Sequence, residues 1–186
     1  SHQQPLGITM SLQRRLALLK YAHENASWVI EDDYDSEFRY RGRPLPALAA
    51  LDKVGRVLYV GTFSKSLFPS VRIGYVVVPE ILMDAFSKMR NIFGQTSSAI
   101  TEEALSNFMD DGGFAEHIRK MRRLYRDRRD ILLNALRENC SNVLIPQQTD
   151  AGMHIIADIK NGISDRLAHL ELLKSGIDSL PLSIYY

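Results

Sequence analysis

Apolar residues repeat at helical spacing in several parts of the chain. Over residues 11–23 they mark one face of a helix that Ser11 can cap. Residues 80–109 show a similar pattern, with a break near residues 94–97. A long helix is predicted from about residue 114 to residue 139, because its apolar positions form one stripe. The stripe consists of Phe114, Ile118, Met121, Tyr125, Leu132 and Leu136.

Short apolar runs between polar or turn residues predict the strands. Residues 28–30 lead into the acidic stretch 31–35, which is typical of a buried strand that emerges at a sheet edge. Residues 57–60 predict a second buried strand, and residues 72–78 a third. The link between these two is too short for a helical crossover, so we expect an antiparallel pair. In α/β proteins, ligands bind at the carboxyl ends of the strands.

The pattern changes near residue 140. Residues 143–145 and 152–159 predict two strands, Ser164 is a candidate cap for a short helix, and another strand is expected from Ile177 onward. We therefore place a domain boundary near residue 140, between residues 1–139 and residues 140–186. The second part is expected to begin a small α+β domain without completing it. Because the chain starts without a methionine and stops within an apolar stretch, we interpret it as a piece of a longer protein.

Composition is that of an ordinary soluble globular protein. The 186 residues are 45% hydrophobic and 24% charged, and the net charge of +1 favours neither nucleic acid nor a membrane as a partner. The single cysteine, Cys140, excludes an internal disulfide and a multi-cysteine zinc site. No apolar run approaches the roughly 20 residues of a membrane helix, and the N-terminus lacks a signal-peptide pattern. These features predict a cytoplasmic location.

Several reactive side chains follow the predicted strands. Asp32 and Tyr34 are two positions apart at the end of the first strand and point to the same side if extended geometry continues. Thr62 and Lys65 follow the second strand, and Arg72 comes seven residues after Lys65. Pyridoxal 5′-phosphate requires a lysine for an imine, an anion for its pyridine nitrogen, and hydroxyls with an arginine for its phosphate. From the residues alone, this cofactor is one candidate among several.

Longer segments around these residues resemble a known family. Residues 31–38, the interval of 33 positions from Asp32 to Lys65, and residues 62–75 are similar to class I and II aminotransferases of fold type I. They are more similar still to the aminotransferase-like effector domains of MocR-type regulators of the GntR family. Two further segments resemble the cofactor-site loop and the interdomain helix of those proteins, residues 1–7 and 117–125. The resemblance implies a large domain with three α/β/α layers on a mostly parallel sheet, and a homodimer.

The resemblance also implies roles for individual residues. Lys65 matches the lysine that forms the internal aldimine with pyridoxal 5′-phosphate, and Asp32 matches the partner of the pyridine nitrogen. Tyr34 matches the phenol near the ring hydroxyl of the cofactor. Three residues match positions that hold the phosphate, and these are Thr62, Ser64 and Arg72.

The first loop departs from the aminotransferase pattern. No asparagine precedes Pro5, and Gln3 or Gln4 is the candidate substitute for its contact. The resemblance also places the aromatic residue that stacks on the cofactor before Ser1, and the arginine that binds a substrate carboxylate after Tyr186. Cofactor binding by this segment alone is therefore expected to be weak.

Structural roles or other functions are alternative interpretations for some of these residues. A single lysine after a strand is usually a solvated surface residue. Asp33 and Asp35 after an apolar strand are also typical of haloacid-dehalogenase-type phosphatases, in which carboxylates bind magnesium, although the expected Gly-Thr is missing. The arginine-rich helix over residues 114–139 has the charge for DNA contact. Its interspersed acidic residues and apolar stripe favour a packed, salt-bridged interdomain helix.

Two functions are consistent with the resemblance. One is an amino-acid aminotransferase, in which Lys65 moves the proton between substrate and cofactor carbons and the partner molecules are an amino acid and a 2-oxo acid. The other is a sensor of an amine within a transcriptional regulator, whose DNA-binding domain lies outside this chain. The residues over 31–38 and 117–129 favour the regulator. The sequence identifies neither the amine nor the DNA operator.

Overall fold

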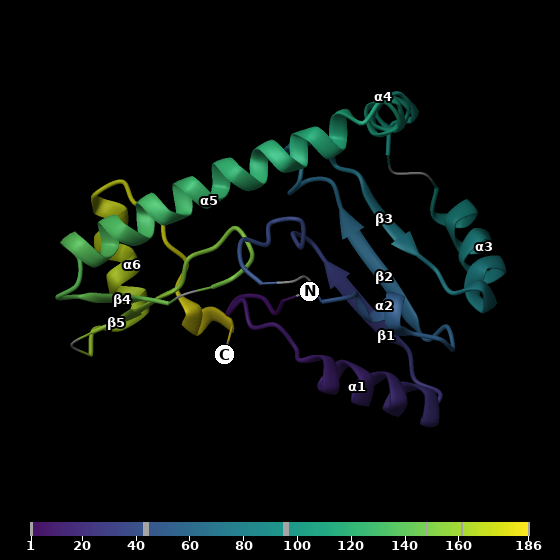
Figure 1. Cartoon of the computed structure of the whole chain (residues 1–186), viewed down its shortest axis with the longest axis horizontal. Helices are drawn as coiled ribbons and strands as arrows, with labels where there is room; N and C mark the ends of the chain where they lie inside the picture. Colours follow the sequence, from purple (N-terminus) through teal and green to yellow (C-terminus); the bar gives the residue numbers. More distant parts are fainter. Residues whose placement is uncertain (1, 43–44, 95–96, 148, 161, 186) are drawn as a thin grey trace.

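The computed structural model describes residues 2–42, 45–94, 97–147, 149–160 and 162–185. A three-stranded sheet lies beneath one end of a long helix, α5 (Gly113–Asn139), and a two-stranded sheet lies beneath its other end (Figure 1). No helix among the described residues is both long enough and apolar enough to cross a membrane.

The three-stranded sheet is built from the predicted strands. They are β1 (Val29–Asp33), β2 (Val57–Thr62) and β3 (Gly74–Val77), in that spatial order. β1 and β2 are parallel, and β2 and β3 are antiparallel, which confirms the prediction for the second pair. A short helix, α2 (Leu48–Leu51), lies on the connection between β1 and β2. The chain is thus α/β, but three layers on a mostly parallel sheet are not evident among the described residues.

Helices α1 (Leu12–Glu24) and α6 (Asp165–Lys174) begin where the sequence predicts. In both, a serine side chain accepts a hydrogen bond from a backbone N–H of the first turn, which otherwise has no partner within the helix. Ser11 accepts from Arg14 N, and Ser164 accepts from Leu167 N.

The helical stretch predicted over residues 80–109 consists of three pieces. They are η2 (Glu80–Leu82), α3 (Met83–Phe93) and α4 (Ala99–Asp110). The predicted break is confirmed at Gly94, which ends α3 with a φ of 77°, a value that glycine adopts without steric cost. The break was also placed on residues 95–96, which lie outside the described residues.

The buried face of α5 departs from the predicted stripe after Tyr125. Ile118 and Leu133 are buried, whereas Leu132 is 48% exposed, so the assignment of Leu132 was wrong. Steps of four residues from Tyr125 lead to Arg129 and Leu133, and both are buried. A charged residue therefore occupies a position on the packed face, where a pattern of apolar residues alone does not find it.

The part of the chain after α5 contains less strand than predicted. β4 (Leu144–Pro146) and β5 (Ala157–Ile159) form an antiparallel pair. The strand predicted over residues 152–159 is confirmed only for its last three residues, and Gly152, with a φ of 88°, is not extended.

The strand predicted from Ile177 onward is wrong. Residues 177–181 are irregular, and a 3-10 helix, η3 (Leu182–Tyr185), follows. Asp165, in the first turn of α6, accepts a hydrogen bond from Ser183 N at 2.7 Å, so this backbone group bonds a side chain instead of a neighbouring strand.

An apolar cluster fixes the segment that follows β2. The buried residues are Val71, Ile73 and Leu105, with Phe63 and Leu67 packed against them. Phe63 also meets the ring of Phe114 at 5.7 Å, so the cluster joins this segment to α4 and α5. A short 3-10 helix within it, η1 (Pro69–Val71), leads into β3. The position of Lys65, between Phe63 and Leu67, is thereby set by packing on both sides.

Candidate functional site

Alternation along β1 separates its acidic residues between the two faces of the sheet. Glu31 and Asp33 are buried, whereas Asp32 between them is exposed. In a strand, neighbouring side chains point to opposite faces, so each face receives a different set. Asp35, two residues after Asp33, is also buried.

Glu31 has a structural role. Its Oε1 and Oε2 accept hydrogen bonds from Leu48 N and Ala49 N, at 2.8 and 3.0 Å, which satisfies the first backbone donors of α2. Oε1 also lies 3.6 Å from Nη1 of the buried Arg15. Arg15 in turn donates to the carbonyl oxygens of Pro46 and Met10. The pair therefore connects α1, β1 and α2.

Asp33 is held by Tyr59 on the neighbouring strand. The Tyr59 hydroxyl donates to Asp33 Oδ2 at 2.6 Å, and Ser36 N donates to Oδ1 at 3.3 Å. Burial first, and then the hydrogen bond to Asp33, raise the pKa of Tyr59 far above its usual value, so this phenol stays protonated.

The strand register brings Asp32 and Thr62 to one edge of the sheet. Asp32 pairs with Val60, and Thr62 lies two residues further along β2, on the same face. Neighbouring strands are about 4.8 Å apart, and Thr62 is two residues beyond the position opposite Asp32, so the two residues lie at the same end of the sheet. Thr62 Oγ1 donates to Ile73 O at 3.3 Å and accepts from Ser64 N at 3.1 Å. Thr62 thus fixes the backbone of the loop that carries Ser64 and Lys65.

Lys65 and Arg72 are both exposed near this edge of the sheet. Arg72 follows η1 and has a φ of 47° and a ψ of 37°, a left-handed conformation that costs energy for any residue except glycine. The carbonyl oxygen of the next residue, Ile73, accepts a hydrogen bond from the Thr62 hydroxyl. The backbone of Arg72 therefore lies close to the loop that carries Lys65. The two cations come from opposite ends of the packed segment between β2 and β3.

Tyr34 follows β1, with its hydroxyl between two side chains of the first loop. The hydroxyl is 2.8 Å from Gln4 Oε1 and 3.3 Å from His2 Nε2. Burial, followed by the nearby carboxylates of Asp35, Asp32 and Asp33, raises the pKa of Tyr34 to about 12. The phenol is therefore neutral at physiological pH and available as a hydrogen-bond donor.

Asp35 links this loop to the segment after α5. It is fully buried, with Oδ1 at 3.1 Å from His2 Nε2 and Oδ2 accepting from Met153 N at 3.2 Å. A cavity of about 10 Å³ lies beside these residues, lined among others by His2, Tyr34 and His154. A cavity of this size holds one water at most.

The phosphatase interpretation finds no support in this arrangement. Asp33 and Asp35 are directed to Tyr59 and to His2, not toward a shared position. Within the described ranges, no group of three or more His, Cys, Asp or Glu residues is placed to hold a metal ion.

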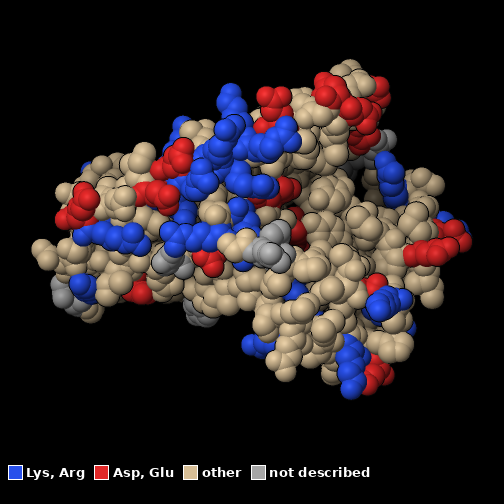
Figure 2. Space-filling model, viewed as in Figure 1, with Lys and Arg blue, Asp and Glu red and all other residues tan. Residues whose placement is uncertain are grey.

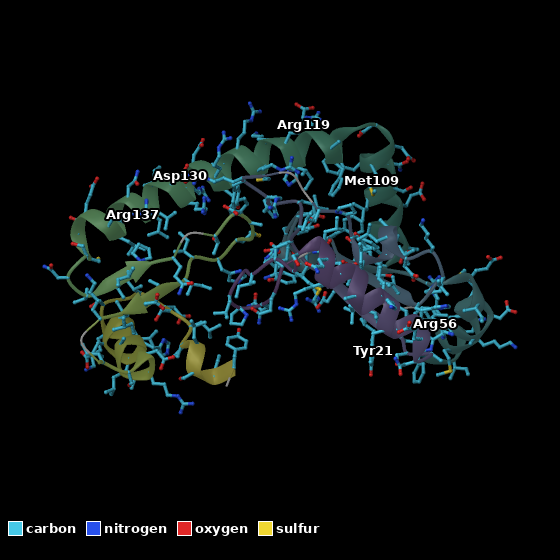
Figure 3. All side chains as sticks on the ribbon, turned by 60° about the horizontal axis from the view of Figure 1, so that its bottom comes forward. Tyr21, Arg56, Met109, Arg119, Asp130 and Arg137 are labelled. Atoms are coloured by element: carbon cyan, nitrogen blue, oxygen red, sulfur yellow. The ribbon has the colours of Figure 1, made fainter. Side chains whose placement is uncertain are left out.

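Some arginines of α5 form ion pairs with acidic side chains of the same helix. Figure 2 shows lysine and arginine side chains gathered over the middle of α5, with acidic side chains beside them. In Figure 3, Arg119, Asp130 and Arg137 mark the length of the helix. Ion pairs join Arg126 to Asp127 at 3.7 Å and Arg129 to Asp130 at 3.6 Å. These contacts and the buried face agree with a packed, ion-paired helix.

Arg129 is a structural residue that the sequence did not single out. Its guanidinium is buried, donates to Thr149 O and lies 5.4 Å from the centre of the Tyr40 ring. Tyr40 N in turn donates to Asp150 O at 2.8 Å, and Arg39 forms an isolated β-bridge with Ala151. Arg129 thus packs against a junction between the loop after β1 and residues 149–151.

The structure therefore brings together part of the predicted set. Asp32, Thr62 and the start of the Lys65 loop share one sheet edge, and Tyr34 follows the same strand as Asp32. Sequence reasoning used the two-residue period for Asp32 and Tyr34 but missed that the same period places Glu31, Asp33 and Asp35 inside. It also missed His2, whose role depends on a contact across 33 positions of the chain.

Comparison with known proteins gives consistent results. Residues 1–178 match the family described as aminotransferase class I and II. The chain is 42% identical over 98% of its length to a probable rhizopine catabolism regulatory protein MocR of Rhizobium meliloti, and 39% identical over its whole length to an uncharacterized HTH-type transcriptional regulator, YdeL, of Bacillus subtilis. It covers 37% and 40% of these proteins, so it spans about two fifths of their length.

Solved structures show the same likeness. The structure of Pyrococcus horikoshii kynurenine aminotransferase, in complex with PMP and kynurenine, matches with a TM-score of 0.85 and 33% identity. The match covers 96% of this chain and 44% of that one. An archaeal alanine:glyoxylate aminotransferase matches with the same TM-score at 30% identity.

Proposed function

The chain belongs to the class I and II aminotransferase family, and from this we propose that it contributes Lys65 and its neighbours to a pyridoxal 5′-phosphate site. The observation that supports the proposal is the strand register, which pairs Asp32 with Val60, two residues before Thr62, at the end of the sheet where the Lys65 loop begins. The PMP in the kynurenine aminotransferase structure supports the choice of cofactor.

The chemistry of the side chains at this edge fits the cofactor. When bound, pyridoxal 5′-phosphate supplies an electron sink for chemistry at the carbon next to an amine. In the proposal, Lys65 Nζ holds the cofactor covalently, and the Asp32 carboxylate keeps a proton on its pyridine nitrogen. Tyr34 is a neutral donor to the ring oxygen. Three residues bind the phosphate, namely Thr62, Ser64 and Arg72.

We propose that the site belongs to a regulator of transcription rather than to an enzyme. The relatives with about 40% identity are regulators, and one of them is named a probable rhizopine catabolism regulatory protein. In this proposal, an amine or amino acid that reaches Lys65 shifts a conformational equilibrium of the whole protein. DNA is bound by a domain outside this chain, the complete protein is a homodimer, and it acts in the cytoplasm.

An amino-acid aminotransferase is the second candidate. It is favoured by the solved structures, whose names are those of aminotransferases. In either protein, we propose that the complete large domain has three α/β/α layers, that residues 1–139 belong to it, and that residues 140–186 begin the small domain. α5, which spans both sheets, is then the helix between domains.

The absorption spectrum of the complete protein with pyridoxal 5′-phosphate tests the site. We expect a visible band in the wild type, and borohydride reduction should fix the cofactor to the peptide that contains Lys65. Lys65→Ala should abolish the band, whereas Lys53→Ala, a change to another exposed lysine at the opposite end of β2, should retain it. A folded wild type without a band, or a Lys65→Ala variant that keeps it, would refute the proposal.

A second experiment separates regulator from enzyme. Amino transfer from a panel of amino acids to 2-oxoglutarate is measured, together with binding of the complete protein to its own promoter DNA. A regulator should show DNA affinity that changes with an added amine and little turnover. Sustained transfer with no DNA binding would instead identify an aminotransferase.

A further inference from the structure

A buried contact in the site involves His2, Tyr34 and Asp35. His2 Nε2 lies 3.1 Å from Asp35 Oδ1 and 3.3 Å from the Tyr34 hydroxyl oxygen. The side chains of His2 and Asp35 are 3% and 1% exposed. Among the described residues, Asp35 Oδ1 accepts no hydrogen bond of good geometry, so its contact with His2 is electrostatic.

The chemistry of these groups determines where the hydrogens lie. A carboxylate has only lone pairs, so a bare Nε2 lone pair at 3.1 Å from Asp35 Oδ1 would be repelled, and Nε2 therefore carries a hydrogen. The Tyr34 oxygen accepts this N–H. Its own hydrogen then points to Gln4 Oε1 at 2.8 Å, an atom that only accepts. The direction of donation is thus from His2 to Tyr34 and from Tyr34 onward.

The surroundings of His2 show that this position is closely packed. A Cβ on Gly152 would lie 2.8 Å from His2 Nε2, so only glycine leaves room for the ring. Asp35 is held from the other side by Met153 N. His2 is therefore fixed by segments that are far apart in the chain, the loop after β1 at residue 35 and the segment at residues 152–153.

We propose that His2 is a positioning residue of the cofactor site, which holds the Tyr34 hydroxyl so that its hydrogen is donated toward the cofactor's ring oxygen. The proposal rests on the proposed function above. The Tyr34 oxygen already accepts a hydrogen bond from the His2 N–H. The Tyr34 hydroxyl can therefore donate its own hydrogen to one other acceptor. Gln4 Oε1 is that acceptor in this structure, and the cofactor oxygen replaces or shares it in the loaded protein.

This role has a spectroscopic consequence. A hydrogen bond donated to the ring oxygen stabilises the deprotonated form of the cofactor chromophore and so lowers the pH at which its visible band changes. Without His2, the Tyr34 hydroxyl is free to rotate and the donation weakens. The titratable groups around Tyr34 are Asp32, Asp33 and Asp35 of the β1 region, His2, His154 beside the small cavity, and Tyr185 of η3. None of the variants below changes these groups except the one under test.

The test is a pH titration of the visible band in the complete protein loaded with pyridoxal 5′-phosphate. Tyr34→Phe should raise the pH midpoint of the visible band. His2→Leu should also raise this midpoint, by about half a pH unit or more. His2→Gln, which keeps an N–H donor at a similar reach, should titrate close to the wild type. The double variant His2→Leu/Tyr34→Phe should show no shift beyond that of Tyr34→Phe alone.

The outcomes separate this proposal from the proposed function. If the wild type shows the band and Tyr34→Phe shifts the midpoint but His2→Leu does not, the role of His2 is wrong and the site itself stands. Absence of the band from the wild type would refute the site. If His2→Leu does not fold, His2→Phe replaces it, because the aromatic ring fills a similar space but donates no N–H and leaves Asp35 unchanged. A smaller shift in the same direction supports the proposal, and an unchanged midpoint overturns it.

Discussion

At the scale of single residues, the two-residue period of β1 decides the role of each acidic side chain. Glu31 and Asp33 point inward to Arg15 and Tyr59, while Asp32 points outward at the sheet edge. A buried carboxylate is stable only with partners that donate to it, and the inward residues have them. Asp32, which is exposed, is the candidate among them for contact with a ligand.

Arg72 combines a strained backbone with a proposed contact, and the two effects can be separated. Arg72→Gly and Arg72→Ala both remove the guanidinium, so both should weaken the affinity for pyridoxal 5′-phosphate by a similar factor. Glycine relieves the left-handed φ of 47°, so Arg72→Gly should be more stable than Arg72→Ala by about 1 kcal/mol. Cofactor titration and urea unfolding measure the two quantities. Equal stability of the variants would show that the conformation is not costly here.

The raised pKa of Tyr34 predicts an alkaline loss of stability. Its pKa is about 12 in the folded chain and about 10 when unfolded, so the folded state holds the proton more tightly. The contribution of this pKa difference to the free energy of unfolding is complete below pH 10. It is lost as the pH rises from about 10 to about 12. Tyr34→Phe should therefore flatten the fall of unfolding free energy in this range. Tyr21→Phe, which removes the hydroxyl of an exposed tyrosine, is the matched control.

At the scale of elements, side chains at strand and helix ends hold neighbouring elements together. Glu31 of β1 satisfies the first N–H groups of α2, and Arg15 of α1 reaches the same carboxylate. α2 has only four residues and cannot form on its own, so its stability depends on this cap. One charged residue therefore affects three elements.

Glu31→Gln tests this connection. The amide retains one acceptor for α2 but removes the negative charge beside the buried Arg15 guanidinium, and we expect a loss of about 3 kcal/mol. Glu24→Gln is the matched control, since Glu24 pairs with Lys20 at 3.7 Å on the surface and should contribute under about 0.5 kcal/mol. Urea unfolding compares the two. Similar small losses would show that the buried pair is dispensable.

At the scale of the whole molecule, α5 connects the sheet that carries the candidate site with the β4–β5 sheet (Figure 1). The junction between them includes Arg129, Tyr40 and the backbone at residues 149–152. Asp35 also reaches this junction through Met153 N. Asp35 therefore contacts both the first loop, through His2, and the segment after α5, through Met153 N.

Arg129→Met removes the charged end of the buried side chain while it keeps most of its volume. Thr149 O loses its donor and Tyr40 loses the cation near its ring, so we expect a loss of about 2–3 kcal/mol. Arg128→Met, one position away on the exposed side of α5, should change stability by less than about 0.5 kcal/mol. Thermal and urea unfolding of the complete protein provide the measurement. Equal effects would place Arg129 outside the junction.

The sequence by itself determined the elements whose signals are local. Ser11 and Ser164 capped their helices, the strands at residues 29–33 and 57–62 followed the apolar runs, and the short link before β3 made it antiparallel. The candidate cofactor residues also came from local motifs and from family resemblance. These features depend on periodicity, capping chemistry and connection length, which are properties of neighbouring residues.

Tertiary structure decided what depends on distant partners. Leu132 is exposed and Arg129 buried because the face of α5 is set by what packs against it. In place of the strand expected from Ile177, an irregular segment leads to η3, whose Ser183 N donates to Asp165. The contact of His2 with Asp35 and the position of Tyr34 between His2 and Gln4 likewise require the folded chain. A buried polar group needs a partner, and the identity of that partner is fixed only when distant segments meet.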